Sequence, residues 1–227
     1  QDTFHHEALY RGQDALDKLA ALRLVICGAG AVGSNLLLNL IRQGIERITV
    51  IDFDRIEEHN IGTQSYSVDD VGAFKVEMLQ ADAFRIAEVE IDTVRKRLTE
   101  RNVAKLLKEA DLVIDGFDNH ASRAIVTQHC KKANIPCLHI GLSAEYAEVL
   151  WNKGYRVPKD MAQGNACDYP MARNLIIFAI AIASAGGLTL GALLAALGEP
   201  GRHFLADAQH QRAQAFGEDD PGQIGDR

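Results

Sequence analysis

The chain has 227 residues, with 24 lysines and arginines against 31 aspartates and glutamates and a formal net charge of −7. This length suffices for one large α/β domain with its own core, so no disulfide or metal is needed to hold it together. Acidic and basic residues are mixed along the chain, without the basic stripe typical of nucleic-acid-binding proteins. We therefore do not expect nucleic acid as the main partner.

The four cysteines are spread along the chain without a C-x-x-C pair: Cys27, Cys130, Cys137 and Cys167. Their spacing predicts neither a zinc site nor a disulfide framework, which favours a reducing, cytoplasmic environment. The polar start of the chain lacks the apolar core of a signal peptide, so secretion is not expected.

Residues 1–22 are predicted to form a helical lead-in, with Ala15, Leu16, Leu19 and Leu22 on one face. From residue 23 onwards, apolar strands and amphipathic helices alternate. The strands are expected near 23–27, 47–53, 89–94, 111–115, 136–140 and 146–151, and the helices near 33–43, 71–87, 100–109, 120–133, 171–185 and 188–197. This alternation predicts a doubly wound, Rossmann-like and mostly parallel α/β sheet with C-terminal helices. The last two strands have no helix between them, which predicts an antiparallel edge.

A glycine-rich turn follows the first predicted strand, in the run RLVICGAGAVGS. Gly28, Gly30 and Gly33 have the G-x-G-x-x-G spacing of a loop that lets the backbone approach phosphates, with the next helix pointing its N-terminus at the anion. Such strings also occur in ordinary turns. Asp52 ends the second strand about 20 residues further on, where a carboxylate can hold ribose hydroxyls. Together these features predict nucleotide binding.

Three polar residues that a dehydrogenase does not need follow the second strand. Asn60 and Gln64 can hydrogen-bond phosphate or ribose oxygens, and Lys75 can neutralise charge on a transferred phosphate. Each also has a plain structural interpretation. Asn60 can cap a turn, Gln64 can face solvent, and Lys75 can lie on the polar side of an amphipathic helix.

The fourth strand ends in an acidic motif that includes Asp118 and Asn119, with Arg123 one helical turn later. A carboxylate that faces a phosphate loop is favourable chiefly through a divalent cation, because carboxylate and phosphate repel each other. Alternatively, Asp118 or Asn119 caps the next helix. Capping and magnesium binding are compatible.

Residues 175–197 carry no charge and are long enough to span a bilayer. We expect Gly186 and Gly187 to divide this stretch into two shorter helices, and we favour a buried pair or an oligomer face over a membrane span. We divide the chain into the lead-in, a main α/β domain at 23–197 with a polar crossing loop at 152–170, and a tail at 198–227 that is expected to be disordered at its end.

Taken together, these motifs resemble the adenylation domain of the ubiquitin-activating-enzyme superfamily, which includes bacterial activators of sulfur-carrier proteins. The resemblance rests on the glycine loop, the Asp52-Phe-Asp54 strand end, Asn60 with Gln64, Lys75, and the Asp118-Asn119 motif with Arg123. It implies ATP and Mg²⁺ as cofactors and a partner protein with a C-terminal glycine, whose carboxylate attacks the α-phosphate. By position, Asp52 would hold the ribose, Lys75 and Asn60 the phosphates, and Asp118 the magnesium.

The chain departs from this family pattern in two ways. Thr63 stands where relatives carry an arginine, and it cannot supply a guanidinium fork. Arg55, Arg123 or a partner subunit's arginine such as Arg11 could substitute. The two C-x-x-C pairs that bind zinc in many relatives are absent from the sequence, which suggests a compact member.

Cys167 differs from the other cysteines because it lies in the polar crossing loop just before a predicted helix. The resemblance puts it where thioester-forming activators carry their nucleophile, and a helix N-terminus lowers a thiol pKa. Asp168 beside it acts in the opposite direction. We expect Cys167 to be the nucleophile, against the alternative of a loop cysteine with no role, and we expect the other three cysteines to be core residues.

The preferred interpretation is a homodimeric enzyme that adenylates a ubiquitin-like or sulfur-carrier protein, with a conjugating enzyme as a further potential partner. An NAD-dependent oxidoreductase would share the glycines and Asp52 but leave Lys75 and Asp118 unused. A non-catalytic subunit of a heterodimer would tolerate the loss of phosphate ligands, and Thr63 is the only residue that favours this alternative. An enzyme that adenylates a transfer-RNA nucleoside is disfavoured by the acidic charge balance.

Overall fold

The structure is a computed structural model that describes residues 3–143, 146–157 and 175–196, and these build one six-stranded sheet with the order β3-β2-β1-β4-β5-β6. The strands are β1 (Arg23–Cys27), β2 (Arg47–Ile51), β3 (Asp92–Val94), β4 (Leu112–Asp115), β5 (Cys137–Ser143) and β6 (Tyr146–Trp151). The first five strands run parallel and β6 pairs antiparallel with β5, as the sequence predicts.

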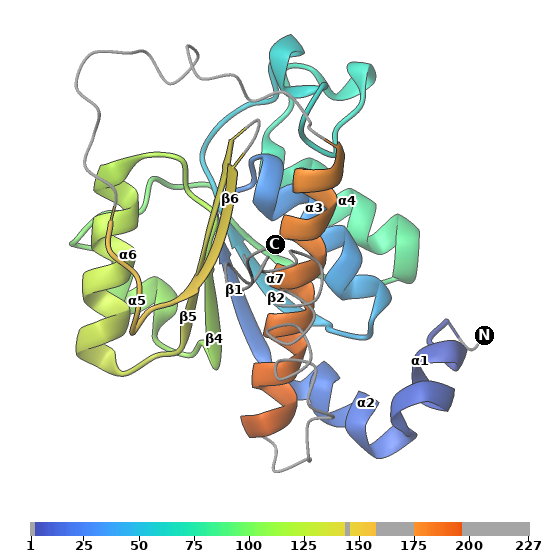
Figure 1. Cartoon of the computed structure of the whole chain (residues 1–227). Coiled ribbons are helices and arrows are strands. Elements are labelled where there is room, and N and C mark those ends of the chain that lie inside the picture. Colours follow the sequence, from blue (N-terminus) through green and yellow to red (C-terminus); the bar gives the residue numbers. More distant parts are fainter. Residues whose placement is uncertain (1–2, 144–145, 158–174, 197–227) are drawn as a thin grey trace, which may run out of the picture.

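The helices cover both faces of this sheet, as Figure 1 shows. They are α1 (His5–Arg11), α2 (Gln13–Ala21), α3 (Ala31–Arg42), α4 (Lys75–Ala87), α5 (Val103–Leu107), α6 (His120–Ala133) and α7 (Leu175–Ala196). Short 3₁₀ turns occur at η1 (Glu58–Asn60) and η2 (Val68–Asp70). α3, α4 and α7 pack on one face around a large apolar core, and α5 and α6 pack on the other around a smaller one. The doubly wound Rossmann-like fold is therefore confirmed.

The apolar C-terminal stretch departs from the prediction. α7 runs through Gly186 and Gly187 as one helix, so the prediction of two helices divided by these glycines was wrong. Each helical glycine costs about 1 kcal/mol relative to alanine, but burial of Ile182, Ala185 and Leu190 against the sheet offsets this cost. Within the described ranges, no helix is long and apolar enough to cross a membrane.

The other boundaries shift in ways that local contacts explain. α4 begins only at Lys75, because η2 and a turn at Gly72 (φ +91°) occupy the residues before it. β3 is shorter than predicted, although Val89 and Ile91 before it are buried in the core. The lead-in is two helices separated at Gly12 (φ +87°).

The strand order reverses between β1 and β4, which are hydrogen-bonded neighbours although α3, β2, α4, β3 and α5 separate them in sequence. In open α/β sheets, ligands bind beyond the carboxyl ends of the strands at such a switch point. Here the loops after β1 and β4 touch. The amide of Gly116 donates to the carbonyl of Cys27 at 2.9 Å, and a Cβ on Gly28 would lie 3.0 Å from the Gly116 oxygen.

Candidate active site

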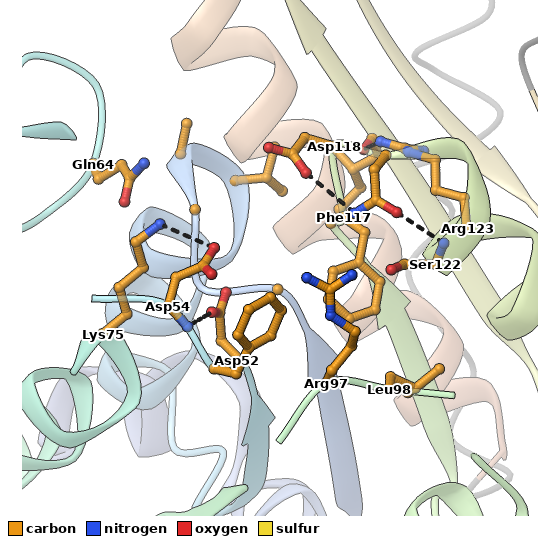
Figure 2. A pocket seen from close by; sticks show the side chains of 18 of the residues that line it. Asp52, Asp54, Gln64, Lys75, Arg97, Leu98, Phe117, Asp118, Ser122 and Arg123 are labelled. Carbon is orange, nitrogen blue, oxygen red and sulfur yellow. Dashed lines mark hydrogen bonds and ion pairs between the residues drawn. The ribbon is translucent and has the colours of Figure 1, made fainter. Parts of the chain in front are cut away.

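A pocket with a cavity volume of about 160 Å³ opens at this switch point. Its walls come from the loop after β1, the ends of β2, β3, β4 and β5, and the first turns of α3, α4 and α6 (Figure 2). The polar side chains that line it are Asp52, Asp54, Gln64, Lys75, Lys96, Arg97, Asp118, Asn119, Ser122 and Arg123. Most of the predicted site residues therefore surround one cavity.

The glycine loop has the geometry that its spacing predicts. Gly28 has a φ of +96°, and a Cβ on Gly33 would lie 1.9 Å from the Gly28 carbonyl oxygen, so only glycine lets α3 pack against the loop. Gly30 has no atom within 4 Å of such a Cβ and lines the pocket. Phosphate can thus approach the backbone at Gly30 and the N-terminus of α3.

Two side chains from other segments hold the peptide of Ala29 within the loop. Asp52, which is 7% exposed, accepts the Ala29 amide at 2.7 Å through Oδ2 and the Asp54 amide at 2.8 Å through Oδ1. The buried phenol of Tyr66 donates to the Ala29 carbonyl at 2.7 Å. Both polar groups of this peptide unit are therefore held by side chains of the protein. Each Asp52 oxygen keeps a further lone pair that a ribose hydroxyl can use.

Lys75 begins α4 and turns its ammonium into the pocket, where its side chain is only 9% exposed. Its Nζ lies 3.9 Å from Oδ2 of Asp54. Burial and the Asp52 carboxylate raise the pKa of Asp54, while Lys75 and Arg97 lower it and Asp118 raises it further. A buried cation beside crowded carboxylates is suited to hold an anionic ligand with its counter-ion.

Gln64 and Asn60 lie differently, although both belong to the segment after β2. Oε1 of Gln64 is buried, lines the pocket and has no hydrogen-bond partner among the described residues, so it is available to a ligand. Asn60 is outside the pocket lining, and its Oδ1 accepts the Glu57 amide at 3.0 Å in a capping box. The plain interpretation of Asn60 as a turn cap thus matches its contacts.

The motif of Asp118 and Asn119 allows two roles, helix capping and cation binding, and the structure gives capping to Asn119. Asn119 is the N-cap of α6, because its Oδ1 accepts the amide of Ser122 at 2.9 Å. Asp118 makes no capping bond, is exposed, and lines the pocket on the side opposite Lys75 (Figure 2). Its Oδ1 accepts only a long contact, at 3.4 Å, from the Asn119 side-chain amide, so the carboxylate remains accessible to a ligand or cation.

Arg123 lines the pocket from α6 but is only 8% exposed. Its Nη1 donates to the Tyr155 hydroxyl at 2.9 Å and its Nη2 to the Ile140 carbonyl at 2.7 Å. Behind it, the buried His139 bonds Asp115 through Nδ1 at 2.8 Å. The sequence interpretation missed His139, although a lone histidine in the apolar run CLHIGL is a signal for a buried polar partner.

A second missed group is Lys96 and Arg97, which follow β3 and line the pocket. The Arg97 guanidinium lies over the Phe53 ring, 4.5 Å from its centroid. The signal was the basic run at 95–97 directly after the third predicted strand, at the sheet edge that carries the glycines.

Two of the arginines proposed to replace the one missing at Thr63 are engaged elsewhere in this chain. Arg55 donates to the Gly72 carbonyl at 2.6 Å, and Arg11 pairs with Glu7 at 2.8 Å. Neither lines the pocket, whereas Arg123 and Arg97 do.

The three cysteines that the structure describes are core residues, as the sequence predicts. Cys27, Cys130 and Cys137 are buried free thiols in the smaller core. Burial raises the pKa of Cys27, and a hydrogen bond with Cys130 and burial raise that of Cys137. These thiols are not reactive nucleophiles. Cys167, the crossing loop beyond residue 157 and the tail lie outside the described residues.

The structure combines a doubly wound Rossmann-like fold with a pocket at the switch point, which a glycine loop, a lysine and a carboxylate line. The ThiF family matches residues 6–210, and the chain belongs to this family. This membership confirms the resemblance to the ubiquitin-activating superfamily.

Several curated proteins are similar to part of the chain. The probable adenylyltransferase/sulfurtransferase MoeZ of Mycobacterium tuberculosis is 32% identical over 127 residues, 55% of this chain and 32% of that protein. The sulfur carrier protein ThiS adenylyltransferase of Bacillus subtilis is 32% identical over 135 residues, 56% and 39% of the two chains. The SAMP-activating enzyme E1 of Haloferax volcanii is 29% identical over 130 residues, which are 56% of this chain and 48% of that protein. The chain thus spans between a third and a half of these relatives' length.

Solved structures share the fold over more of the chain. The Escherichia coli tRNA N6-threonylcarbamoyladenosine dehydratase TcdA in complex with AMP superposes with a TM-score of 0.73 at 20% identity, covering 87% of this chain and 96% of that one. A structure titled TcdA (CsdL) is 29% identical, with a TM-score of 0.61 and coverage of 64% and 61%.

Proposed function

We propose that this protein adenylates the C-terminal carboxylate of a ubiquitin-like or sulfur-carrier protein with ATP. One observation carries the proposal: a glycine loop, the buried ammonium of Lys75 and the carboxylate of Asp118, which does not cap α6, line a single pocket. A nicotinamide-dependent oxidoreductase has no use for the last two groups. Relatives named as sulfur-carrier and SAMP activators support the choice of substrate.

In this reaction a carboxylate oxygen of the partner attacks the α-phosphorus of ATP, and the bond from that phosphorus to the pyrophosphate oxygen breaks. The glycine-loop amides and Lys75 would stabilise the charge on the phosphates. Gln64 and Asp52 would hold ribose or phosphate groups, with Asn119 and Arg123 on the opposite wall. Asn60 would act by shaping the 57–60 turn, given its capping bond to the Glu57 amide.

The residues present also fit a magnesium ion. Mg²⁺ is usually held by one or two carboxylates plus substrate phosphates and waters, and Asp118 with Asp54 offers that oxygen set on two sides of the pocket. The described residues contain no cluster of three or more acidic, histidine or cysteine ligands that could hold a metal by themselves. When bound with ATP, the ion would neutralise part of the phosphate charge.

The nucleotide step is tested by calorimetry and pyrophosphate exchange. We expect ATP with Mg²⁺ to bind and NAD to bind much more weakly. Asp118→Asn should lower pyrophosphate exchange by about 10²-fold or more with an unchanged thermal midpoint, because it removes a ligand charge and no packing. Glu58→Gln, an exposed change on η1 outside the pocket lining, is the matched control and should retain exchange. Tight NAD binding without a response to ATP would overturn the proposal.

The second step proposed is thioester formation at Cys167. Its thiolate would attack the acyl adenylate carbonyl, AMP would leave, and the partner would remain bound through sulfur. Cys167→Ala should still form the adenylate but give no reducing-agent-sensitive adduct. Cys27→Ala, Cys130→Ala and Cys137→Ala should keep the adduct, with only the stability loss of small core changes. A thiol-sensitive adduct that survives in Cys167→Ala would refute this role.

We further propose that the enzyme works as a homodimer in the cytoplasm. In support of a dimer, α7 exposes uncharged side chains such as Ala179, Ile180 and Ala183. The free thiols of the core fit a reducing compartment. The molar mass in solution tests the dimer.

Adenylation of a modified transfer-RNA nucleoside is the second candidate, because structures titled as TcdA are among the most similar. The net charge of −7 disfavours it. Pyrophosphate exchange that depends on added transfer RNA, and not on a protein ending in glycine, would select it.

A further inference from the structure

Behind the pocket wall formed by α6 and β5 lies a chain of buried polar groups that the nucleotide site does not use directly. Asp115 and His139 are both fully buried, and the histidine Nδ1 lies 2.8 Å from the Asp115 carboxylate. The other ring nitrogen, Nε2, lies 3.0 Å from Oδ1 of Asn152. Because both nitrogens are paired, the imidazole ring cannot turn about its bond to the backbone.

The fixed ring of His139 in turn fixes an aromatic side chain. Tyr155, which is 2% exposed, stacks on it with ring centroids 3.8 Å apart and an angle of 8° between the planes. The Tyr155 hydroxyl accepts a hydrogen bond from Nη1 of Arg123 at 2.9 Å. The chain of contacts therefore ends at a guanidinium that lines the pocket (Figure 2).

Burial of the polar groups of Asp115, His139 and Tyr155 is costly unless each of them has a hydrogen-bond partner. An apolar set of the same shape is often as stable or more stable, so the polar set needs a reason other than stability. Two of the five N–H groups of Arg123 bond the Ile140 carbonyl and Tyr155, and three remain for other partners. Without its two bonds, the flexible arginine would have to be ordered at the moment of binding.

We propose that His139 and Tyr155 are positioning residues that hold the Arg123 guanidinium ready for an anionic group of the reactants. This inference rests on the proposed function for the identity of that anion, a phosphate or the attacking carboxylate. It extends the functional site from the pocket wall to the strand ends of β4 and β5 and to the segment after β6.

The decisive variant is Tyr155→Phe, which keeps the stacked ring and removes one oxygen. We expect kcat/KM for ATP in pyrophosphate exchange to fall about tenfold at a temperature at which the variant is fully folded, since a hydrogen bond to a charged group is lost. The same loss should lower the thermal midpoint by a few degrees without unfolding the protein. Tyr146→Phe is the matched control. Its hydroxyl bonds Glu148 on the exposed side of β6, so it should leave exchange unchanged.

A double-mutant cycle tests whether Tyr155 acts through Arg123. If it does, Tyr155→Phe should have little further effect on exchange in an Arg123→Lys background. Equal effects in both backgrounds would overturn the inference, as would wild-type exchange in Tyr155→Phe.

A measurement on the ligand-free protein separates this inference from the proposed function. The Nε–Hε NMR signal of Arg123 should be sharp in the wild type and in Tyr146→Phe, and broadened in Tyr155→Phe and in a folded His139→Gln. An Arg123 signal that is unchanged in Tyr155→Phe refutes the positioning role whatever the enzyme does. Broadening together with failure of the wild type to bind ATP would leave the positioning intact and overturn the nucleotide function.

Discussion

The two walls of the pocket are built on different principles. The wall formed by the ends of β1 and β2 is held by hydrogen bonds between side chains and the main chain, in which Asp52 and Tyr66 fix the peptide of Ala29. The wall formed by the ends of β4 and β5 is held mainly by contacts between side chains, in the series from Asp115 through His139 and Tyr155 to Arg123. Arg123 also donates to the main-chain carbonyl of Ile140.

This difference has a chemical consequence. A backbone-held loop presents N–H groups whose position depends on steric fit, so it suits the invariant part of a nucleotide, its phosphates. A side-chain-held cation depends on three aligned groups from distant segments, so it can be tuned by substitution without altering the main chain. We infer that the first wall sets nucleotide binding and the second adjusts the groups that react.

The largest expected effect comes from the first wall. Gly33→Ala would place a Cβ 1.9 Å from the carbonyl oxygen of Gly28, a backbone atom that cannot move aside without opening the loop. We expect the free energy of unfolding to fall by roughly 3 kcal/mol, and ATP binding to be lost in any folded fraction. Urea denaturation measures the first effect and calorimetry the second.

Gly62→Ala is the control, because an added Cβ there meets nothing within 4 Å and the residue lies outside the pocket. It should change the free energy of unfolding by less than about 1 kcal/mol. If both alanine variants are equally stable, the first wall is not determined by steric fit.

The same contrast explains what sequence reasoning could achieve. The glycine loop, Asp52 and Asp118 lie at positions that spacing alone defines, since parallel strands bring their carboxyl ends to one edge of the sheet. The antiparallel edge follows from the lack of a helix between the last two strands, whereas the order of the strands in the sheet was not predicted. Such features depend on local chain geometry, so the sequence reveals them.

The rest depends on which distant side chains meet across the sheet. Tyr66 reaches Ala29 only because the 61–66 segment is tied to α3, where the Asn35 amide donates to the Thr63 carbonyl at 3.2 Å. His139 meets Tyr155 only through the register of β5 and β6. α7 stays whole because packing outweighs the glycine propensity. No short-range pattern encodes any of these contacts.

A second, smaller effect on the first wall is expected for Tyr66→Phe. The buried Ala29 carbonyl would lose its phenol donor, which costs about 1–2 kcal/mol in the free energy of unfolding. The affinity for ATP should fall severalfold, because the loop must then be ordered on binding. Tyr10→Phe, on an exposed tyrosine of α1, should change neither quantity. An unaltered ATP affinity in a destabilised Tyr66→Phe would limit this tyrosine to a structural role.

The smallest effect concerns charge between the walls. Burial and Asp52 raise the pKa of Asp54, so its ionised form destabilises the ligand-free protein, and Asp54→Asn should be slightly more stable near neutral pH. The gain should stay below about 1 kcal/mol, because the side chain is half exposed and solvent screens its interactions. ATP–Mg²⁺ affinity should nevertheless fall, since the lost charge faces Lys75 and the cation.

The sign of the pH dependence follows from the raised pKa. Below about pH 4, the ordinary pKa of an aspartate, Asp54 is protonated in both the folded and the unfolded protein, so the wild type and Asp54→Asn should have the same thermal midpoint. As the pH rises through the higher pKa of the folded state, the wild type loses the stability that protonation gave, and the midpoints should separate. If the wild type instead becomes more stable than the variant over this range, Lys75 and Arg97 lower the pKa of Asp54 by more than burial and Asp52 raise it. In that case the carboxylates between the two walls do not destabilise the protein, and a bound cation would have no repulsion between them to relieve.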